Sequence, residues 1–212
     1  MKEDIRLIKK QHLKRLWKVH KITNDFDLWD VWHIPIKADN SKTENFKTFY
    51  TIAVKSFLMI ESRKSITSFL FKIRFLIGKI FPFDKNINTL PIPDCKETSI
   101  KQRLTNQDLK QDKCGKRIKS KNIGLDFPSV YLFEQESLHE LSNDTVHGLV
   151  HLGWIKVDNY YTATLAIYTK PRGKMGKIYL KLIEPFRHYI VYPAIMKSIK
   201  KEWQKNVLSK EK

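Results

Sequence analysis

The chain has 212 residues, of which 42% are hydrophobic, and it carries a formal net charge of +18 at pH 7. This length and apolar content indicate one folded domain with extensions and exclude a disordered chain. Charged residues interrupt every apolar stretch before it reaches the ~18 residues of a membrane-spanning helix, and the basic N-terminus lacks the apolar stretch of a secretory signal, so the sequence predicts a cytoplasmic protein.

The positive charge comes mainly from lysines that are spread over nearly every segment. A nucleic-acid interface is more often an arginine-rich stripe interleaved with aromatic residues, and none of the nucleic-acid-binding modules with a readable motif occurs in the chain. We therefore expect a solvated, lysine-rich surface and no specific nucleic-acid partner.

Residues 1–22 form a basic N-terminal extension in which Ile5, Ile8, Leu16 and Val19 fall partly at helical spacing. Such a segment can lie as an amphipathic helix on an anionic membrane, or it can pack against the domain as a cap. We favour the cap, and a weak contact with anionic membrane stays open as the alternative.

The domain begins with a predicted strand and two predicted helices. Trp, Val and Ile are frequent from Phe26 to Ile34, which favours a strand that Pro35 ends or places at a sheet edge. Ser41 is placed to cap a helix over Thr43–Val54, where apolar residues recur on one face. A second helix is predicted over Ser65–Ile80 from the same kind of pattern.

Residues 84–128 are polar and are interrupted by Pro and Gly, so they predict a long excursion with one short helix near 100–111. A loop of this length is either functional, for example as a lid over a pocket, or a decoration of the fold. Cys95 and Cys114 both lie in this excursion, and in the cytoplasm we expect them to be reduced thiols.

After Pro128 the pattern becomes that of strands. Four runs are rich in β-prone residues, namely Val130–Gln135, Leu138–Ser142, Thr145–Ile155 and Tyr160–Thr169. The connections between them are too short for parallel crossovers, so the sequence predicts an antiparallel meander.

A long, aromatic-rich helix follows the last strand through Pro171, Arg172 and Gly173 and extends to Trp203. This layout predicts that the helix lies across a curved sheet, with a pocket between them. Pro185 and Pro193 each remove a backbone donor from the helix, so kinks are expected there.

Arg187 and His188 are the strongest candidates for functional polar side chains, because they lie between aromatic residues on the long helix. A cation in such a surface needs a carboxylate, a carbonyl or an anionic ligand as partner. Pairing with Glu184 or extension into solvent is the alternative. Arg74, on the second predicted helix, is a candidate for the same reason.

His147 and His151 are four residues apart, which on a helix would suit a shared metal ion. Their neighbours alternate as in a strand, however, and in a strand the two histidines would lie ~13 Å apart. We therefore predict no metal site. His147 either faces a cavity or has a structural role. No phosphate-binding loop, nucleophile motif or paired-cysteine metal motif occurs, so the sequence indicates no cofactor and no catalytic residue.

Two stretches, SVYLFEQESLHELSNDTVHGLVHLGW and KPRGKMGKIYLKLIEPFRHYIVYPAIMKSI, resemble the bacterial family called domain of unknown function 2867 of the Bet v 1/START-like (SRPBCC) superfamily. The segment FLFKIRFLIGKIFPF from Phe69 to Phe83 is also similar to that family. The most specific steps are Pro171-Arg172-Gly173, Gly176-x-x-Tyr179, Pro185-Phe186-Arg187-His188 and Tyr192-Pro193.

This resemblance implies an α+β helix-grip fold. A curved antiparallel sheet would be wrapped on the long C-terminal helix, and two short helices would follow the first strand. Residues 23–206 would form the single domain, with 1–22 as an extension, 84–128 as an insertion and 207–212 as a tail. Members of the wider superfamily bind hydrophobic ligands, and some are cyclases or hydrolases.

Together these observations predict a binder of a small apolar or amphipathic molecule, held between the sheet and the C-terminal helix. The residues expected to contact this ligand are Arg187, His188, Tyr192, His147 and Arg74 as polar groups and Trp154 and Tyr179 as walls. A cyclase-like or hydrolase-like enzyme with a histidine as general acid or base is one alternative. A peripheral protein that contacts anionic membrane through residues 1–22 is the other.

Overall fold

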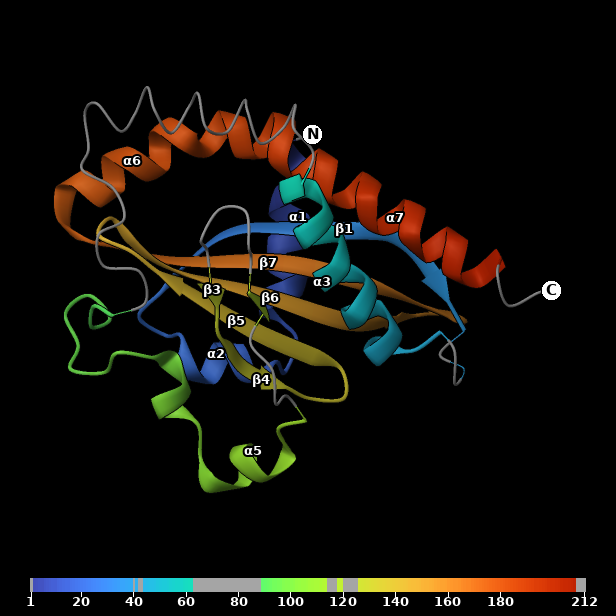
Figure 1. The fold of residues 1–212 in the computed structure, drawn as a ribbon, viewed down its shortest axis with the longest axis horizontal. Helices are drawn as coiled ribbons and strands as arrows, with labels where there is room; N and C mark the ends of the chain where they lie inside the picture. The colour runs from blue at the N-terminus through green and yellow to red at the C-terminus, as the bar shows by residue number, and fades with distance from the viewer. Residues whose placement is uncertain are drawn as a thin grey trace.

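A five-stranded antiparallel sheet with the strand order β1-β7-β6-β5-β4 forms the centre of the fold (Figure 1). The computed structural model describes residues 2–39, 41, 44–62, 89–113, 118–119 and 126–208. The strands of the sheet are β1 (Asp27–Ala38), β4 (Ser129–Leu132), β5 (Glu136–Ser142), β6 (Val146–Val157) and β7 (Tyr160–Pro171). A separate pair consists of β2 (Ile118–Lys119) and β3 (Asp126–Phe127).

The predicted meander is confirmed, because β4, β5, β6 and β7 are antiparallel neighbours in chain order. The first strand is longer than predicted and continues through Pro35 to Ala38. Since β1 lies at the sheet edge and its pairing with β7 is irregular between Ile34 and Ala38, the missing N–H of Pro35 removes no regular ladder bond.

The helix after β1 is α3 (Phe46–Ser62), which begins later and ends later than predicted. Asn45 caps it in place of the predicted Ser41, because the Asn45 side-chain oxygen accepts a hydrogen bond from the Thr48 N–H at 3.1 Å. The second predicted helix, with Arg74, lies outside the described residues.

The single short helix predicted near residues 100–111 is two helical turns. These are η1 (Ile100–Arg103) and α5 (Asn106–Gln111), and each begins with a capping box, at Ser99 and at Thr105. They are separate because Leu104 has an extended backbone between them.

The C-terminal helix consists of α6 (Gly173–Phe186), a π-helical turn η2 (Arg187–Val191) and α7 (Tyr192–Leu208). The positive φ of 61° at Gly173 allows the chain to turn directly from β7 into the helix. The Tyr192 N–H donates to the Arg187 carbonyl, five residues earlier, as in a π-helix. The π-turn lies between Pro185 and Pro193, and the kinks expected at these two residues stay a prediction.

Both faces of the sheet are covered (Figure 1). On one face, α3 and α7 pack on the strands through a core that includes Ile34, Leu152 and Ile199. On the other face, Val19 and Ile22 of α2 (Lys18–Ile22) belong to a second core together with η1. The predicted boundary between residues 22 and 23 coincides with the end of α2. None of the described helices is long and apolar enough to cross a membrane.

The start of α6 lies close against the β5–β6 turn. A β-carbon at Gly176 would clash with the Thr145 carbonyl oxygen, whereas at Gly148 it would only reach ordinary contact, 3.7 Å from the Leu141 carbonyl oxygen. We expect Gly176→Ala to lower the free energy of unfolding by about 1–3 kcal/mol, although alanine favours helix, because a backbone atom must move.

Urea denaturation of Gly176→Ala and of Gly148→Ala, as its matched control, checks this expectation. The Gly148→Ala midpoint should stay close to that of the unmodified protein. Equal midpoints for the two variants would show that the α6 contact is not tight.

Candidate functional site

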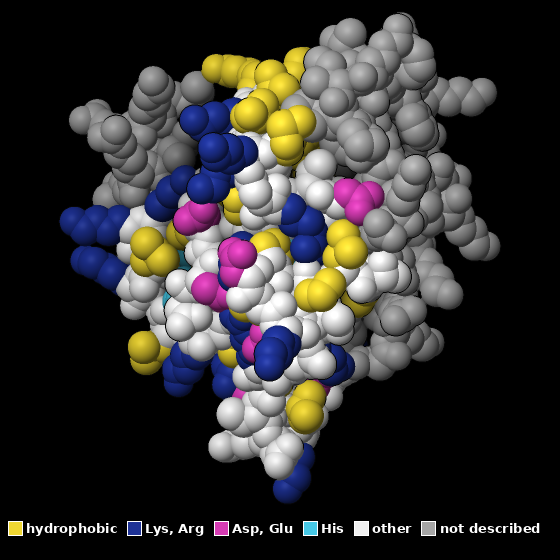
Figure 2. Space-filling model, turned by 90° about the vertical axis from the view of Figure 1, so that its left-hand side faces the viewer, with side chains coloured by type: hydrophobic (Ala, Val, Ile, Leu, Met, Phe, Trp, Pro, Cys, Tyr) yellow, Lys and Arg dark blue, Asp and Glu magenta, His cyan; other side chains and the backbone are white. Residues whose placement is uncertain are grey.

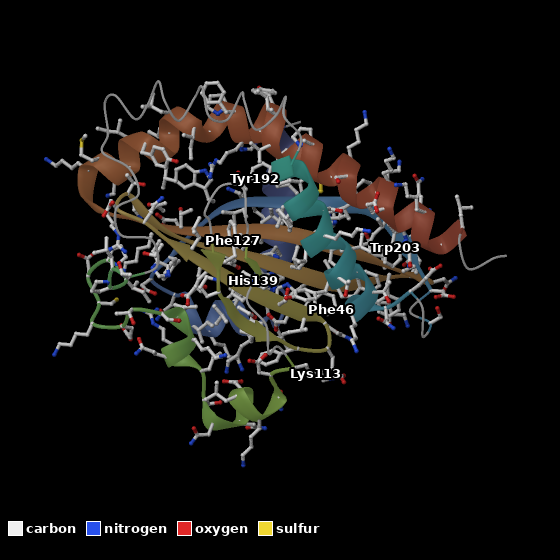
Figure 3. All side chains as sticks on the ribbon, viewed as in Figure 1. Phe46, Lys113, Phe127, His139, Tyr192 and Trp203 are labelled. Atoms are coloured by element: carbon white, nitrogen blue, oxygen red, sulfur yellow. The ribbon has the colours of Figure 1, made fainter. Side chains whose placement is uncertain are left out.

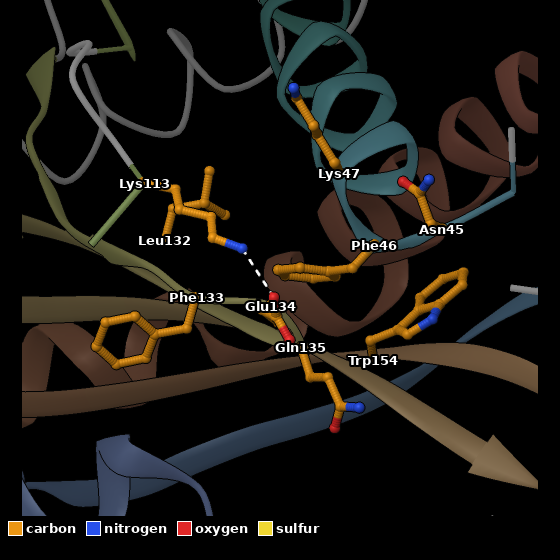
Figure 4. A pocket seen from close by; sticks show the side chains of 9 residues that line it. All are labelled: Asn45, Phe46, Lys47, Lys113, Leu132, Phe133, Glu134, Gln135 and Trp154. Atoms are coloured by element: carbon orange, nitrogen blue, oxygen red, sulfur yellow. Dashed lines mark hydrogen bonds and ion pairs between the residues drawn. The ribbon is translucent and has the colours of Figure 1, made fainter. Parts of the chain in front are cut away.

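An open cleft of about 430 Å³ lies between the start of α3 and the β4–β5 hairpin (Figure 4). Its lining combines an apolar part with a polar rim. The apolar residues are Phe46, Leu132, Phe133 and Trp154, and the polar residues are Asn45, Lys47, Lys113, Glu134 and Gln135. A cleft of this size and mixed character is suited to a small amphipathic molecule.

Two buried aromatic residues give the cleft a firm floor. Phe46 and Trp154 are 3% and 2% exposed, and Trp154 stacks on Phe49 of α3 with ring centroids 5.5 Å apart. The Trp154 N–H also donates to the Gln135 carbonyl at 2.7 Å, which fixes β6 to the β4–β5 hairpin. Trp154 therefore lies in the cleft wall, where its ring packs on Phe49 of α3 and also lies 6.0 Å from the Trp203 ring of the C-terminal helix.

The polar rim of the cleft contains an exposed ion pair that separates easily. Lys113 Nζ reaches Glu134 Oε1 at 2.9 Å (Figure 4), but the two side chains are 59% and 83% exposed. The hydrogen bond from Lys113 keeps the pKa of Glu134 below its usual value. An ion pair this exposed is worth little in water, so an anionic ligand could take the place of Glu134 beside Lys113. Lys47 adds a second cation from α3.

Three of the predicted site residues meet at a carboxylate that sequence analysis missed. Asp30 of β1 is 3% exposed, and its side chain lies 2.9 Å from His188 Nε2 and 3.4 Å from Arg187 Nη2. The Tyr192 hydroxyl donates to Asp30 Oδ2 at 2.8 Å, and Figure 3 shows Tyr192 on the side of the helix that faces the sheet. The Arg187 guanidinium also lies over the Trp29 ring, at 5.2 Å.

This cluster ties the π-turn to β1. Burial, together with the adjacent Asp30 carboxylate, raises the pKa of Tyr192, so its hydroxyl remains a neutral donor. Arg187 uses Asp30 as its partner, not Glu184 as in the alternative interpretation. The contacts of Arg187, His188 and Tyr192 with Asp30 therefore hold the helix on the sheet.

His147 and His151 lie on β6, as predicted, with both side chains on the sheet face away from α7. Each has its own carboxylate on β5. His147 Nε2 is 3.3 Å from Glu140, and His151 Nε2 is 3.0 Å from Glu136. The sheet separates His147 from Arg187 and His188, so these predicted polar residues do not form one site.

The carboxylate of Glu136 also fixes the N-terminal segment. It accepts hydrogen bonds from the Lys18 N–H and the Tyr131 hydroxyl, both at 2.7 Å. Burial would raise the pKa of Glu136, but the hydrogen bonds from His151, Lys18 and Tyr131 outweigh it and hold the pKa below the usual value. Glu136 therefore stays ionised beneath α2.

A second link joins the N-terminal segment to β7. The Tyr168 hydroxyl lies 2.8 Å from His12 Nε2 and 3.1 Å from His20 Nδ1. Burial, and to a lesser extent the nearby His151, lowers the pKa of His12 to about 2. His12, His20 and Tyr168 thus contact one another, and these contacts attach the N-terminal segment to β7.

Two predicted residues remain. Tyr179 is half-buried on α6 and Arg74 is outside the described ranges. In the part of the chain that the structure describes, no group of three or more His, Cys, Asp or Glu side chains could hold a metal ion.

Residues 22–194 match the family described as protein of unknown function (DUF2867). No curated protein and no solved structure shows a significant match to the chain. Since the family match extends over well more than half of the 212 residues, the chain belongs to this family of proteins of unknown function.

Proposed function

We propose that the protein binds a small amphipathic anion in the cleft between α3 and the β4–β5 hairpin. The observation that carries this proposal is the combination of an aromatic floor, formed by Phe46 and Trp154, with the lysines Lys47 and Lys113 at the rim. The apolar body of the ligand would lie on the floor, and its charged group would lie beside the lysines.

The chemistry of the cleft supports this class of ligand. Its volume of about 430 Å³ is within the range of about 300–1,000 Å³ for small-molecule sites. Burial of the apolar body contributes about 25 cal/mol for each Å² removed from water. The lining holds two lysines and one glutamate, and the net charge of +18 favours the approach of an anion.

We also propose that the fold is of the Bet v 1/START-like helix-grip type. Supporting features are β1 beside the last strand β7, a helix after β1, and a long C-terminal helix after β7. The ligand position differs from the one first expected. Ile195 and Ile199 of α7 pack into the core on the sheet, and the cleft lies instead beneath α3.

The fluorescent anion 8-anilinonaphthalene-1-sulfonate tests the cleft, because it has an aromatic body and one negative charge. Lys113→Glu should weaken its binding about tenfold, and Gln135→Trp, which adds bulk to the lining of the cleft, should abolish the binding. Lys110→Glu is the matched control, since this exposed lysine on α5 lies outside the cleft. Equal affinity in all four proteins would contradict the proposal.

Native mass spectrometry of the protein purified from its own host tests the same proposal without a chosen probe. A small molecule should co-purify with the unmodified protein and be lost from Gln135→Trp. Retention of the molecule by Gln135→Trp would place the binding site elsewhere.

A further inference from the structure

Helix α6 carries a row of exposed apolar side chains. Met175, Ile178 and Leu182 are 51%, 49% and 45% exposed, and their spacing places them on one stripe of the helix. Tyr189, which is 71% exposed, follows in the π-turn. The buried side of α6 is formed by other residues, including Leu180. The apolar row is therefore not part of the core.

A row of lysines runs beside the apolar row. Lys174, Lys177 and Lys181 are all exposed, and each directly precedes a residue of the apolar row. One step along a helix is a rotation of about 100°, so the two rows lie side by side. Figure 2 shows hydrophobic side chains next to a group of basic ones at the upper end of this face, where α6 lies. Glu184 is the one acidic residue of α6.

We infer that this face of α6 docks on the surface of an anionic lipid bilayer. The apolar row would enter the boundary between headgroups and acyl chains, and the lysines would extend to the lipid phosphates. Charge complementarity favours lipid as the occupant, because a net charge of +18 attracts anionic membranes. A nucleic acid would pair with the lysines but would leave Met175, Ile178 and Leu182 in water.

The same face is presented in a fixed position. Arg172, just before α6, donates from Nε to the Asn143 carbonyl and from Nη2 to the Ser142 hydroxyl, both at 2.7 Å. The first turn of α6 also lies tightly against Thr145 at Gly176. The apolar row is thus already ordered before it meets a membrane, and binding needs no folding step.

The inferred contact on α6 lies apart from the N-terminal extension, which sequence analysis left open as an alternative membrane contact. Trp17, Val19 and Ile22 are buried in the second core. Leu16 is 98% exposed and lies beside this buried segment. A substitution at Leu16 therefore tests whether the N-terminal extension, rather than α6, contacts the membrane.

Co-sedimentation with phosphatidylcholine vesicles, with and without phosphatidylserine, tests the inference. Binding should require phosphatidylserine and should weaken with added salt. Leu182→Glu should reduce binding about tenfold, as should the pair Lys177→Glu and Lys181→Glu. Leu109→Glu is the matched control, since Leu109 on α5 has the same 45% exposure as Leu182. Lys110→Glu is the matched control for charge.

Three results would overturn the inference. The first is equal binding of Leu182→Glu and Leu109→Glu. The second is a loss of binding in Leu16→Glu, with Leu182→Glu unaffected, which would assign the contact to the N-terminal segment. The third is self-association that Leu182→Glu removes, without any binding to vesicles, which would make a second copy of the chain the occupant. Far-ultraviolet circular dichroism should show all the variants folded.

Discussion

Replacing Asp30 by alanine is expected to lower the free energy of unfolding by about 3 kcal/mol, because the change leaves a partly buried cation and a buried hydroxyl without their acceptor. Asp30 is the common partner of Arg187, His188 and Tyr192. Urea denaturation, with the slope of the transition fitted for each protein, measures the effect.

Three further variants separate the contribution of the Arg187 ion pair from that of the Tyr192 hydrogen bond. Asp27→Ala is the matched control, since this exposed aspartate on the same strand should change the free energy of unfolding by less than about 0.5 kcal/mol. Asp30→Asn should cost less than alanine, because the amide oxygen can still accept from Tyr192. Arg187→Met should recover part of the loss when combined with Asp30→Ala. Additive effects of the two changes would mean that the ion pair does not hold the helix.

The protein is expected to lose about 4 kcal/mol of stability as the pH falls from about 7 to about 5. Burial lowers the pKa of His139 to about 4 and is the largest cause of the pKa of about 2 at His12. In the unfolded chain both histidines bind protons below about pH 6.5, whereas in the folded protein they stay neutral. Protons therefore favour the unfolded chain, and each histidine contributes about 2 kcal/mol over this range.

The free energy of unfolding, measured by urea titration at several pH values, checks this expectation. His12→Gln and His139→Gln should each reduce the stability lost between about pH 7 and about pH 5 by about 2 kcal/mol, whatever they do to stability at pH 7. The two positions are independent, because His12 contacts Tyr168 on one sheet face and His139 lies 3.2 Å from the Tyr50 hydroxyl of α3 on the other. A flat profile in the unmodified protein would contradict the assignment of these pKa values.

The main elements of the fold could be predicted from the sequence because their signals are local. Period-two alternation along residues 145–155 identified β6 and placed His147 and His151 on a common face. The start of α3 and its cap were mispredicted, since Ser41 and Asn45 are equally good caps in sequence and only the path of the chain after β1 selects between them.

The cleft could not be predicted because its residues come from segments that are distant along the chain. Lys113 lies within the polar excursion, Phe46 starts α3 and Trp154 is in β6. Asp30 was missed for a similar reason. Aspartate in a predicted strand carries no signal of burial until the partner helix, with Arg187, is placed over it. The sequence therefore indicated that Arg187 and His188 need a partner, but only the packing of the helix on β1 shows that the partner is Asp30.

The π-turn also sets the rotational phase of the C-terminal helix. A π-turn inserts one residue into an α-helix, and one residue corresponds to a rotation of about 100°. Without that residue, a regular helix that keeps Leu180 on the sheet would turn Ile199 and Trp203 away from it, although both are buried in the core. Arg187–Val191 thus acts as a phase correction that keeps the buried sides of α6 and α7 aligned along one continuous helix.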